Sequence, residues 1–210
     1  MTSTNDESTF EDPAEALRLI EHERHHTFRE VTPDPRLMYW PWGLTWLISF
    51  GLSFLRFGPE GKTFVDMPTW LPLLALTVLL TAAGIFTGVV GARASRHISG
   101  PSSRQGATYG ISWSAGFTSL AIIFGRVSEH VPDEMLGLLW GGGMVALVGV
   151  LYMAGSAIWD VRDMFVLGAW ISVVNVIGVL WGPGWHALVL AVAGGGGLLV
   201  AGFVGWMRRR

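Results

Sequence analysis

Three residues near the N-terminus have the types and the spacing of metal ligands. His22, His26 and Glu30 follow one another at four-residue steps, so in a helix they share one face. Two imidazoles and a carboxylate on one face could hold a divalent metal ion. The alternative is a solvated helix face of mixed charge, which the many charged neighbours favour. We therefore expect no resident cofactor.

A second group of candidates lies deep inside apolar segments. Trp46, Trp113 and Trp170 are each followed eleven residues later by an aromatic residue and a glycine, at 57–58, 124–125 and 181–182. At a rise of 1.5 Å per residue, each indole would lie about 16 Å below the outer face, near the bilayer centre. An indole N–H at that depth needs an acceptor. The three rings either pack against one another and their neighbouring helices, or line a ligand-binding cavity.

Asn175 is the one amide among the polar groups of the apolar segments, where the others are hydroxyls. It could contact a ligand, although a hydrogen bond between helices is the more common role of such a residue. No Asp, Glu, Lys or Arg lies deep inside these segments. Buried ionisable residues are the usual sign of ion or proton coupling, so their absence disfavours a proton-coupled pump.

Several reaction classes lack the residues that they need. The chain has no cysteine, which excludes disulfides, thiolate nucleophiles and cysteine-ligated metal sites. Ser156 and His186 lie near opposite faces of the predicted membrane domain, so they cannot form a catalytic pair for intramembrane proteolysis. We therefore do not expect an enzyme.

The elements that position these residues are long and apolar. Half of the residues are hydrophobic and 14% are charged, against about 25% charged in soluble domains. Segments of about 20 apolar residues are long enough to cross a bilayer as helices. The sequence predicts an all-α integral membrane protein with six transmembrane helices, at 37–57, 70–91, 107–125, 135–158, 164–181 and 185–207.

The basic residues indicate how these helices are directed. With the N-terminus inside, eleven arginines fall on the cytoplasmic side, and the external loops hold only Arg56, Lys62 and Arg126. Cytoplasmic loops are enriched in Lys and Arg, so both ends are predicted to be cytoplasmic. The acidic and polar N-terminus lacks the layout of a cleaved signal peptide.

Three regions follow from this division. Residues 1–36 form a cytoplasmic tail, 37–207 the transmembrane domain and 208–210 a basic cytoplasmic C-terminus. In the tail, Asp12, Pro13 and Glu15 are typical of a helix start, and an interrupted apolar stripe follows. This predicts an amphipathic helix that docks on the membrane domain, on a second copy or on a cytoplasmic partner.

The shared tryptophan spacing predicts an internal repeat. Helices one, three and five carry the pattern, so we interpret the membrane domain as three tandem helical hairpins in parallel orientation. Chance recurrence in a chain rich in Trp and Gly is the alternative. The last segment carries four consecutive glycines at 194–197. These allow close helix packing, or they form a flexible gating segment.

Some motifs resemble those of a known group of proteins. They are Met38-Tyr39-Trp40-Pro41-Trp42-Gly43, Val65-Asp66-Met67-Pro68-Thr69-Trp70 and Gly182-Pro183-Gly184-Trp185-His186, followed by the four glycines. The chain resembles small polytopic membrane proteins of actinobacteria that carry a generic transporter label and have no established activity. The resemblance implies a bacterial inner membrane protein, and it implies no substrate and no functional residue.

The expected function is that of a small transporter or permease component for an uncharged or weakly polar solute. Six helices in so short a chain leave little room for a solute pathway within a single copy. We therefore expect a homo-oligomer or a complex with a partner membrane protein in the lipid bilayer. The alternative is a non-transporting sensor or regulatory subunit that acts through its N-terminal helix. No basic patch indicates a nucleic-acid partner.

Overall fold

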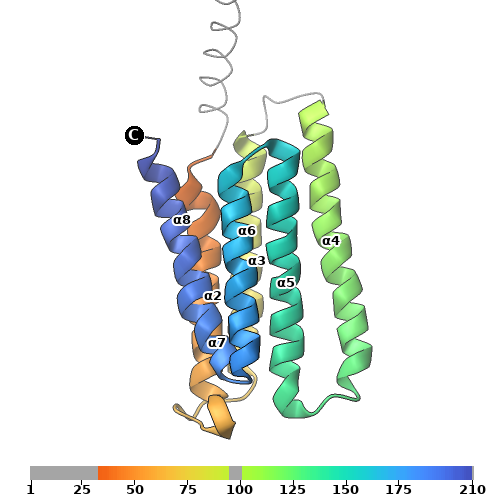
Figure 1. The fold of residues 1–210 in the computed structure, drawn as a ribbon, viewed down its shortest axis with the longest axis vertical. Coiled ribbons are helices and arrows are strands. Elements are labelled where there is room, and N and C mark those ends of the chain that lie inside the picture. Colours follow the sequence, from red (N-terminus) through yellow and green to blue (C-terminus); the bar gives the residue numbers. More distant parts are fainter. Residues whose placement is uncertain (1–32, 95–100, 210) are drawn as a thin grey trace, which may run out of the picture. The chain divides into compact units, whose positions relative to one another are not determined.

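The computed structural model describes residues 33–94 and 101–209, and the regular structure in these ranges is entirely helical. Asp34–Arg210 forms one compact unit. Its elements are α2 (Pro35–Arg56), η1 (Pro59–Gly61), α3 (Leu71–Ala94), α4 (Pro101–Ser128), α5 (Asp133–Trp159), α6 (Arg162–Trp181), α7 (Trp185–Val189), η3 (Leu190–Gly195) and α8 (Gly196–Met207). The last three form one continuous helical run (Figure 1). Each apolar segment predicted from the sequence coincides with a helix, so the all-α class is confirmed for the described residues.

Four of the described helices are long and apolar enough to cross a membrane. They are α3, α5, α6 and the run Trp185–Met207. α2 and α4 do not reach the same apolarity, because α2 is rich in Trp, Tyr and Pro and α4 is rich in Gly, Ser and Thr. Composition and length therefore identify four candidate spans. They do not identify α2 and α4 as spans.

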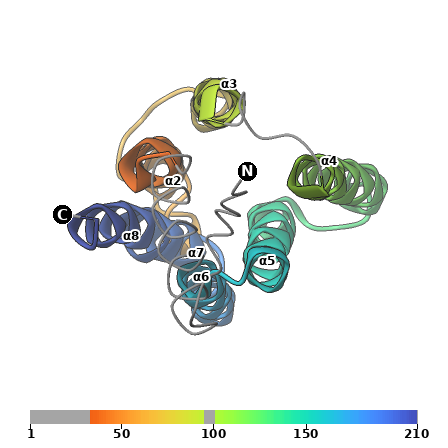
Figure 2. The ribbon, with the colours of Figure 1, turned by 90° about the horizontal axis from the view of Figure 1, so that it is seen from above.

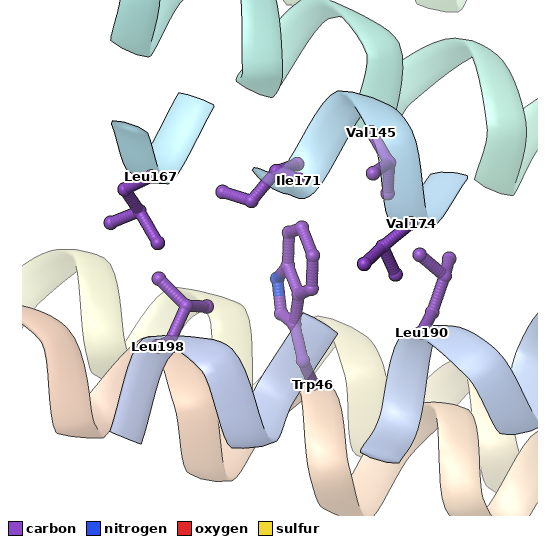
Figure 3. Close-up of a cluster of buried hydrophobic side chains, with 7 residues drawn as sticks. All are labelled: Trp46, Val145, Leu167, Ile171, Val174, Leu190 and Leu198. Carbon is purple, nitrogen blue, oxygen red and sulfur yellow. The ribbon is translucent and has the colours of Figure 1, made fainter. Parts of the chain in front are cut away.

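The hydrophobic core lies where the first helix meets the later ones. Its buried side chains come from α2, α5, α6, η3 and α8 (Figure 3), and they are Trp46, Val145, Leu167, Ile171, Val174, Leu190 and Leu198. α3 packs mainly against α2, and α4 packs mainly against α5 (Figure 2). Both outer helices carry large exposed apolar side chains, among them Leu73 and Ile85 on α3 and Ile111 and Ile122 on α4. Such faces suit contact with lipid chains.

Glycine lets α2 and the last helix approach at backbone distance. A β-carbon placed on Gly195 would lie 2.8 Å from both Gly43 O and Leu47 N, and one on Gly43 would lie 2.9 Å from Gly195 O. Further along the same pair, Gly202 faces the ring of Trp40. Without a hydrophobic driving force between helices in lipid, close backbone contact of this kind supplies the packing energy.

After the contact of α2 with the last helix, the most extensive contact between helices is that of α5 with α6. It also depends on a pair of glycines, because a β-carbon on Gly168 would lie 2.7 Å from Gly149 O. These two helices belong to different members of the predicted series of hairpins, and they are joined by a short turn in which Asp160 adopts the left-handed conformation (φ 52°). α5 thus packs more extensively against α6 than against α4, its partner in the predicted hairpin. The repeat stays a prediction.

Neighbouring glycines in the last helix provide a matched test of this packing. We expect Gly195→Ala to destabilise the fold by about 1–3 kcal/mol, because the added methyl group meets the backbone of α2. Gly196→Ala has no atom within 4 Å of the added carbon, so it should stabilise the helix by up to about 1 kcal/mol. Thermal unfolding of the purified chain in detergent, followed by circular dichroism, measures both. Equal effects of the two substitutions would contradict the packing described here.

Candidate functional site

Asn175 and His186 form a buried polar chain that links three helices. Asn175 on α6 donates from Nδ2 to the carbonyl oxygen of Gly142 on α5, at 2.8 Å. Its Oδ1 lies 2.9 Å from Nε2 of His186 on α7. Because an amide oxygen only accepts, the His186 ring must carry its proton on Nε2 and donate. Both side chains are only 4% exposed.

Two glycines make the space that the imidazole occupies. A β-carbon on Gly141 of α5 would lie 3.0 Å from His186 Cε1, and one on Gly178 of α6 would lie 2.9 Å from His186 Cδ2. The ring is therefore enclosed between two helix backbones. The sequence placed His186 near one face of the membrane domain, and the structure shows that its ring is buried between helices.

Directly after α7, the last helix changes its hydrogen-bonding pattern. η3 is π-helical over Leu190–Gly195, with α-helix on both sides. π-helical segments are rare and occur frequently at functional sites. The glycine run at 194–197 thus begins inside this segment.

Two of the three candidate tryptophans, Trp46 and Trp170, contact the glycine run at 194–197. Trp46 on α2 is 5% exposed and lies in the hydrophobic core (Figure 3). A β-carbon on Gly194 would lie 2.9 Å from its ring. Trp170 on α6 is 47% exposed, and its Nε1 donates to the carbonyl oxygen of Ala193 at 3.0 Å. A β-carbon on Gly197 would meet this nitrogen, so the indole could keep this position only beside a glycine.

Trp113 lies elsewhere. Its ring packs against Tyr109 and Phe117 of α4 and against Tyr152 of α5, with centroid distances of 6.0, 5.8 and 5.9 Å. Tyr109 in turn donates its hydroxyl to the carbonyl oxygen of Leu151, at 2.6 Å. The structure therefore joins Trp46, Trp170, Asn175 and His186 through the last helix and leaves Trp113 in a separate aromatic cluster. A shared ligand cavity lined by all three tryptophans is not what the geometry supports.

Two shallow hollows mark the described surface. One, of about 360 Å³, lies at the turn between α5 and α6, and the other, of about 520 Å³, lies along one face of α4. Neither is lined by Trp46, Trp113, Trp170 or Asn175. The ligand-binding role of these four residues stays a prediction, while their packing and hydrogen bonds are direct observations.

The predicted metal ligands His22, His26 and Glu30 lie outside the described residues, as does the predicted N-terminal helix. Within residues 33–94 and 101–209, no three His, Cys, Asp or Glu side chains gather closely enough to hold a metal ion. The metal site in the tail therefore stays a prediction.

The ends of α2, α6 and α8 that lie near Arg36 carry charged contacts. Asp34 accepts from the backbone N–H of Arg36 and pairs with its guanidinium at 2.7 Å. The hydrogen bond from the Arg36 guanidinium holds the pKa of the Asp34 carboxyl below its usual range. Arg36 also lies over the Trp206 ring at 4.3 Å, and Arg208 pairs with Asp163 at 2.7 Å. Charged groups thus gather at the helix ends, and the site above is built from uncharged groups.

Comparisons of this chain with models of protein families, with curated proteins and with solved structures find no match. The resemblance to actinobacterial membrane proteins therefore stays a prediction.

Removing the amide should weaken the bundle more than removing a nearby hydroxyl. Asn175→Leu leaves the buried His186 ring N–H without its acceptor and removes the side-chain donor to Gly142 O, at a cost of about 1–3 kcal/mol. Ser172→Ala removes a hydroxyl that bonds only the carbonyl of Gly168 in its own helix, so we expect a change within about 0.5 kcal/mol. Unfolding of both variants in mixed detergent micelles gives the comparison. The role of the amide would be refuted by an Asn175→Leu variant as stable as Ser172→Ala.

Proposed function

We propose that the chain crosses the membrane six times, with α2 and α4 as the spans that composition alone does not identify. α2 has 22 residues and is about 33 Å long, enough to cross the hydrocarbon core. It accompanies the last helix over that helix's full length, from Pro35 beside Gly205 at one end to the ring of Phe54 beside Trp185 at the other. If the last helix crosses the membrane, α2 lies at the same depths.

The same argument applies to α4 and α5. Tyr109 makes an edge-to-face contact with Trp159 at one end of α5, and Phe124 makes one with Trp140 toward the other end. The hydroxyls of Ser112 and Ser114 on α4 donate to carbonyls of their own helix, which lowers the cost of placing them in lipid. This pairing supports six spans, and we propose that consecutive helices form three hairpins.

The proposed orientation places both ends of the membrane domain in the cytoplasm. Pro35 at the start of α2 lies beside Gly205 near the end of α8, so both helix ends lie on one side of the bundle (Figure 1). The helix ends on that side hold six described arginines, at 36, 93, 104, 162, 208 and 209, and the opposite side holds Arg56, Lys62 and Arg126. This excess of basic residues supports a cytoplasmic assignment, and the resemblance supports a bacterial inner membrane.

Within this framework, the proposed activity is that of a small transporter or permease component for an uncharged or weakly polar solute. The observation that carries it is the chemistry of the buried polar groups in the described residues. They are three hydroxyls, one amide and one imidazole, at Thr45, Ser49, Thr87, Asn175 and His186. His186 is the one ionisable group among them, and its Nε2 lies 2.9 Å from the neutral amide oxygen of Asn175. None of the five is a carboxylate, ammonium or guanidinium, so the set suits a neutral solute better than ion coupling.

Assembly is part of the proposal. The hollows described above are shallow, and the core around Trp46 is filled by side chains. A pathway would therefore be completed between copies of the chain, or between this chain and a partner membrane protein.

Solute flux into proteoliposomes tests the proposed activity. Vesicles containing the purified full-length chain are exposed to glycerol, urea and erythritol in turn, and solute entry is followed by stopped-flow light scattering. We expect faster entry of at least one solute than in protein-free vesicles, and loss of that excess in Asn175→Leu but not in Ser172→Ala.

Two results would count against transport. One is the absence of excess flux for every solute, and the other is an excess that Asn175→Leu leaves unchanged. Deletion of residues 1–31 separates the alternative, a sensor or regulatory subunit, because such a protein needs its N-terminal helix, whereas flux through the membrane domain should persist without it.

A further inference from the structure

The last helix is held to α6 at two places, one before and one within a π-helical segment. Before η3, His186 is bonded to Asn175, and within η3, Ala193 is bonded to Trp170. We infer that this helix has two registers, one π-helical and one α-helical, and that these two bonds together hold it in the π-helical register. The inference concerns the helix itself and does not depend on transport.

The bond from Trp170 satisfies a carbonyl at the surface of the bundle. A π-helical segment replaces the i→i+4 pattern with i→i+5 bonds, and it needs outside partners where the patterns meet. Ala193 O also accepts from the backbone N–H of Gly196, so the indole is its second donor. Trp170 is half-exposed, so in a bilayer this surface faces lipid, where no water is available to replace that second donor. The indole N–H supplies the donor at 3.0 Å. Loss of this donor removes an interaction that is specific to η3.

The end of the helix beyond η3 is fixed to α2. Trp40 donates from Nε1 to the carbonyl oxygen of Leu199 at 3.1 Å, and its ring lies against Gly202. Pro35 lies against Gly205. α7 also contacts α2, through the rings of Phe54 and Trp185, but no hydrogen bond joins the described residues of these two helices. We therefore expect a change of register in η3 to move α7, while α8 stays on α2.

Conversion of η3 to α-helix would shift α7 by about one residue, which is a rotation of about 100° and a translation of about 1.5 Å. The imidazole of His186 lies between Gly141 and Gly178, where it reaches Asn175, so this rotation takes it away from Asn175. The two bonds to α6 consequently form together and break together. Breaking either one should expose the site of the other.

The energy gap between the registers should be small. The segment ends in glycine, which has a low intrinsic preference for the α-helix and also loses the most freedom on ordering. Single hydrogen bonds between membrane helices are worth little on average, so removal of one corresponds to about a threefold to tenfold change in the population of the other register. A change of this size is measurable without unfolding the protein.

Chemical modification of histidine tests the coupling. The full-length chain in lipid nanodiscs is treated with diethyl pyrocarbonate, and mass spectrometry of the peptides reports each histidine separately. His186 is 4% exposed, whereas His130 is exposed and serves as the internal control. In Trp170→Phe, we expect the modification rate of His186 to rise about threefold to tenfold while that of His130 is unchanged.

Trp40→Phe is the matched control, because it removes the same kind of indole-to-carbonyl bond from α8 outside the π-helical segment. It should leave His186 protected. The inference is overturned if His186 stays protected in Trp170→Phe, or if Trp40→Phe exposes it equally, which would indicate general loosening.

A second variant tests the coupling from the other side. Asn175→Leu should speed backbone hydrogen exchange over 190–195 by a similar factor, measured by mass spectrometry in the same nanodiscs. Unchanged exchange there would also overturn the inference, even if Trp170→Phe fails to fold.

Discussion

A bilayer offers no water to bond, so the polar groups of a helix bundle have to find partners within the protein, and the contacts between these helices depend on that constraint. Among the described residues, Ser49 Oγ and Arg56 Nε are buried exceptions. The amide of Asn175 joins the ring of His186 to a carbonyl on α5. Indole N–H groups at the bundle surface bond carbonyls of neighbouring helices, as Trp170 does for Ala193. Each of these bonds links different helices, so the pairing of polar groups also fixes which helices lie side by side.

The need for such partners explains where the glycines fall. A side chain can reach a backbone carbonyl on another helix only if the two backbones approach closely. Gly141 and Gly178 give His186 room between two helices, and Gly197 lets Trp170 lie on the last helix. By contrast, Gly84 and Gly88 on α3 have no atom within 4 Å of an added β-carbon. Spacing four apart therefore does not by itself identify a glycine contact in this chain.

Much of the fold could be predicted from the sequence, because long apolar runs have no stable alternative to helices. The surroundings of single residues could not. Trp46, Trp113 and Trp170 share one spacing pattern, yet the first is in the core, the second is in an aromatic cluster and the third faces outward. Spacing sets depth along a helix, whereas the rotation of that helix against its neighbours decides what a ring contacts. The partnership of Asn175 with His186 was detectable only as two polar side chains on either side of one turn, and the π-helical segment left no signal beyond its glycines.

The central claim is that the bundle is organised by neutral polar groups that satisfy one another. Nitrogen NMR of histidine-labelled protein in lipid bilayers tests it most directly, since the two ring nitrogens of His186 report protonation separately. At neutral pH the account predicts an uncharged ring with its proton on Nε2, and a shift of that signal in Asn175→Leu. A proton on Nδ1, or a charged ring, would contradict it.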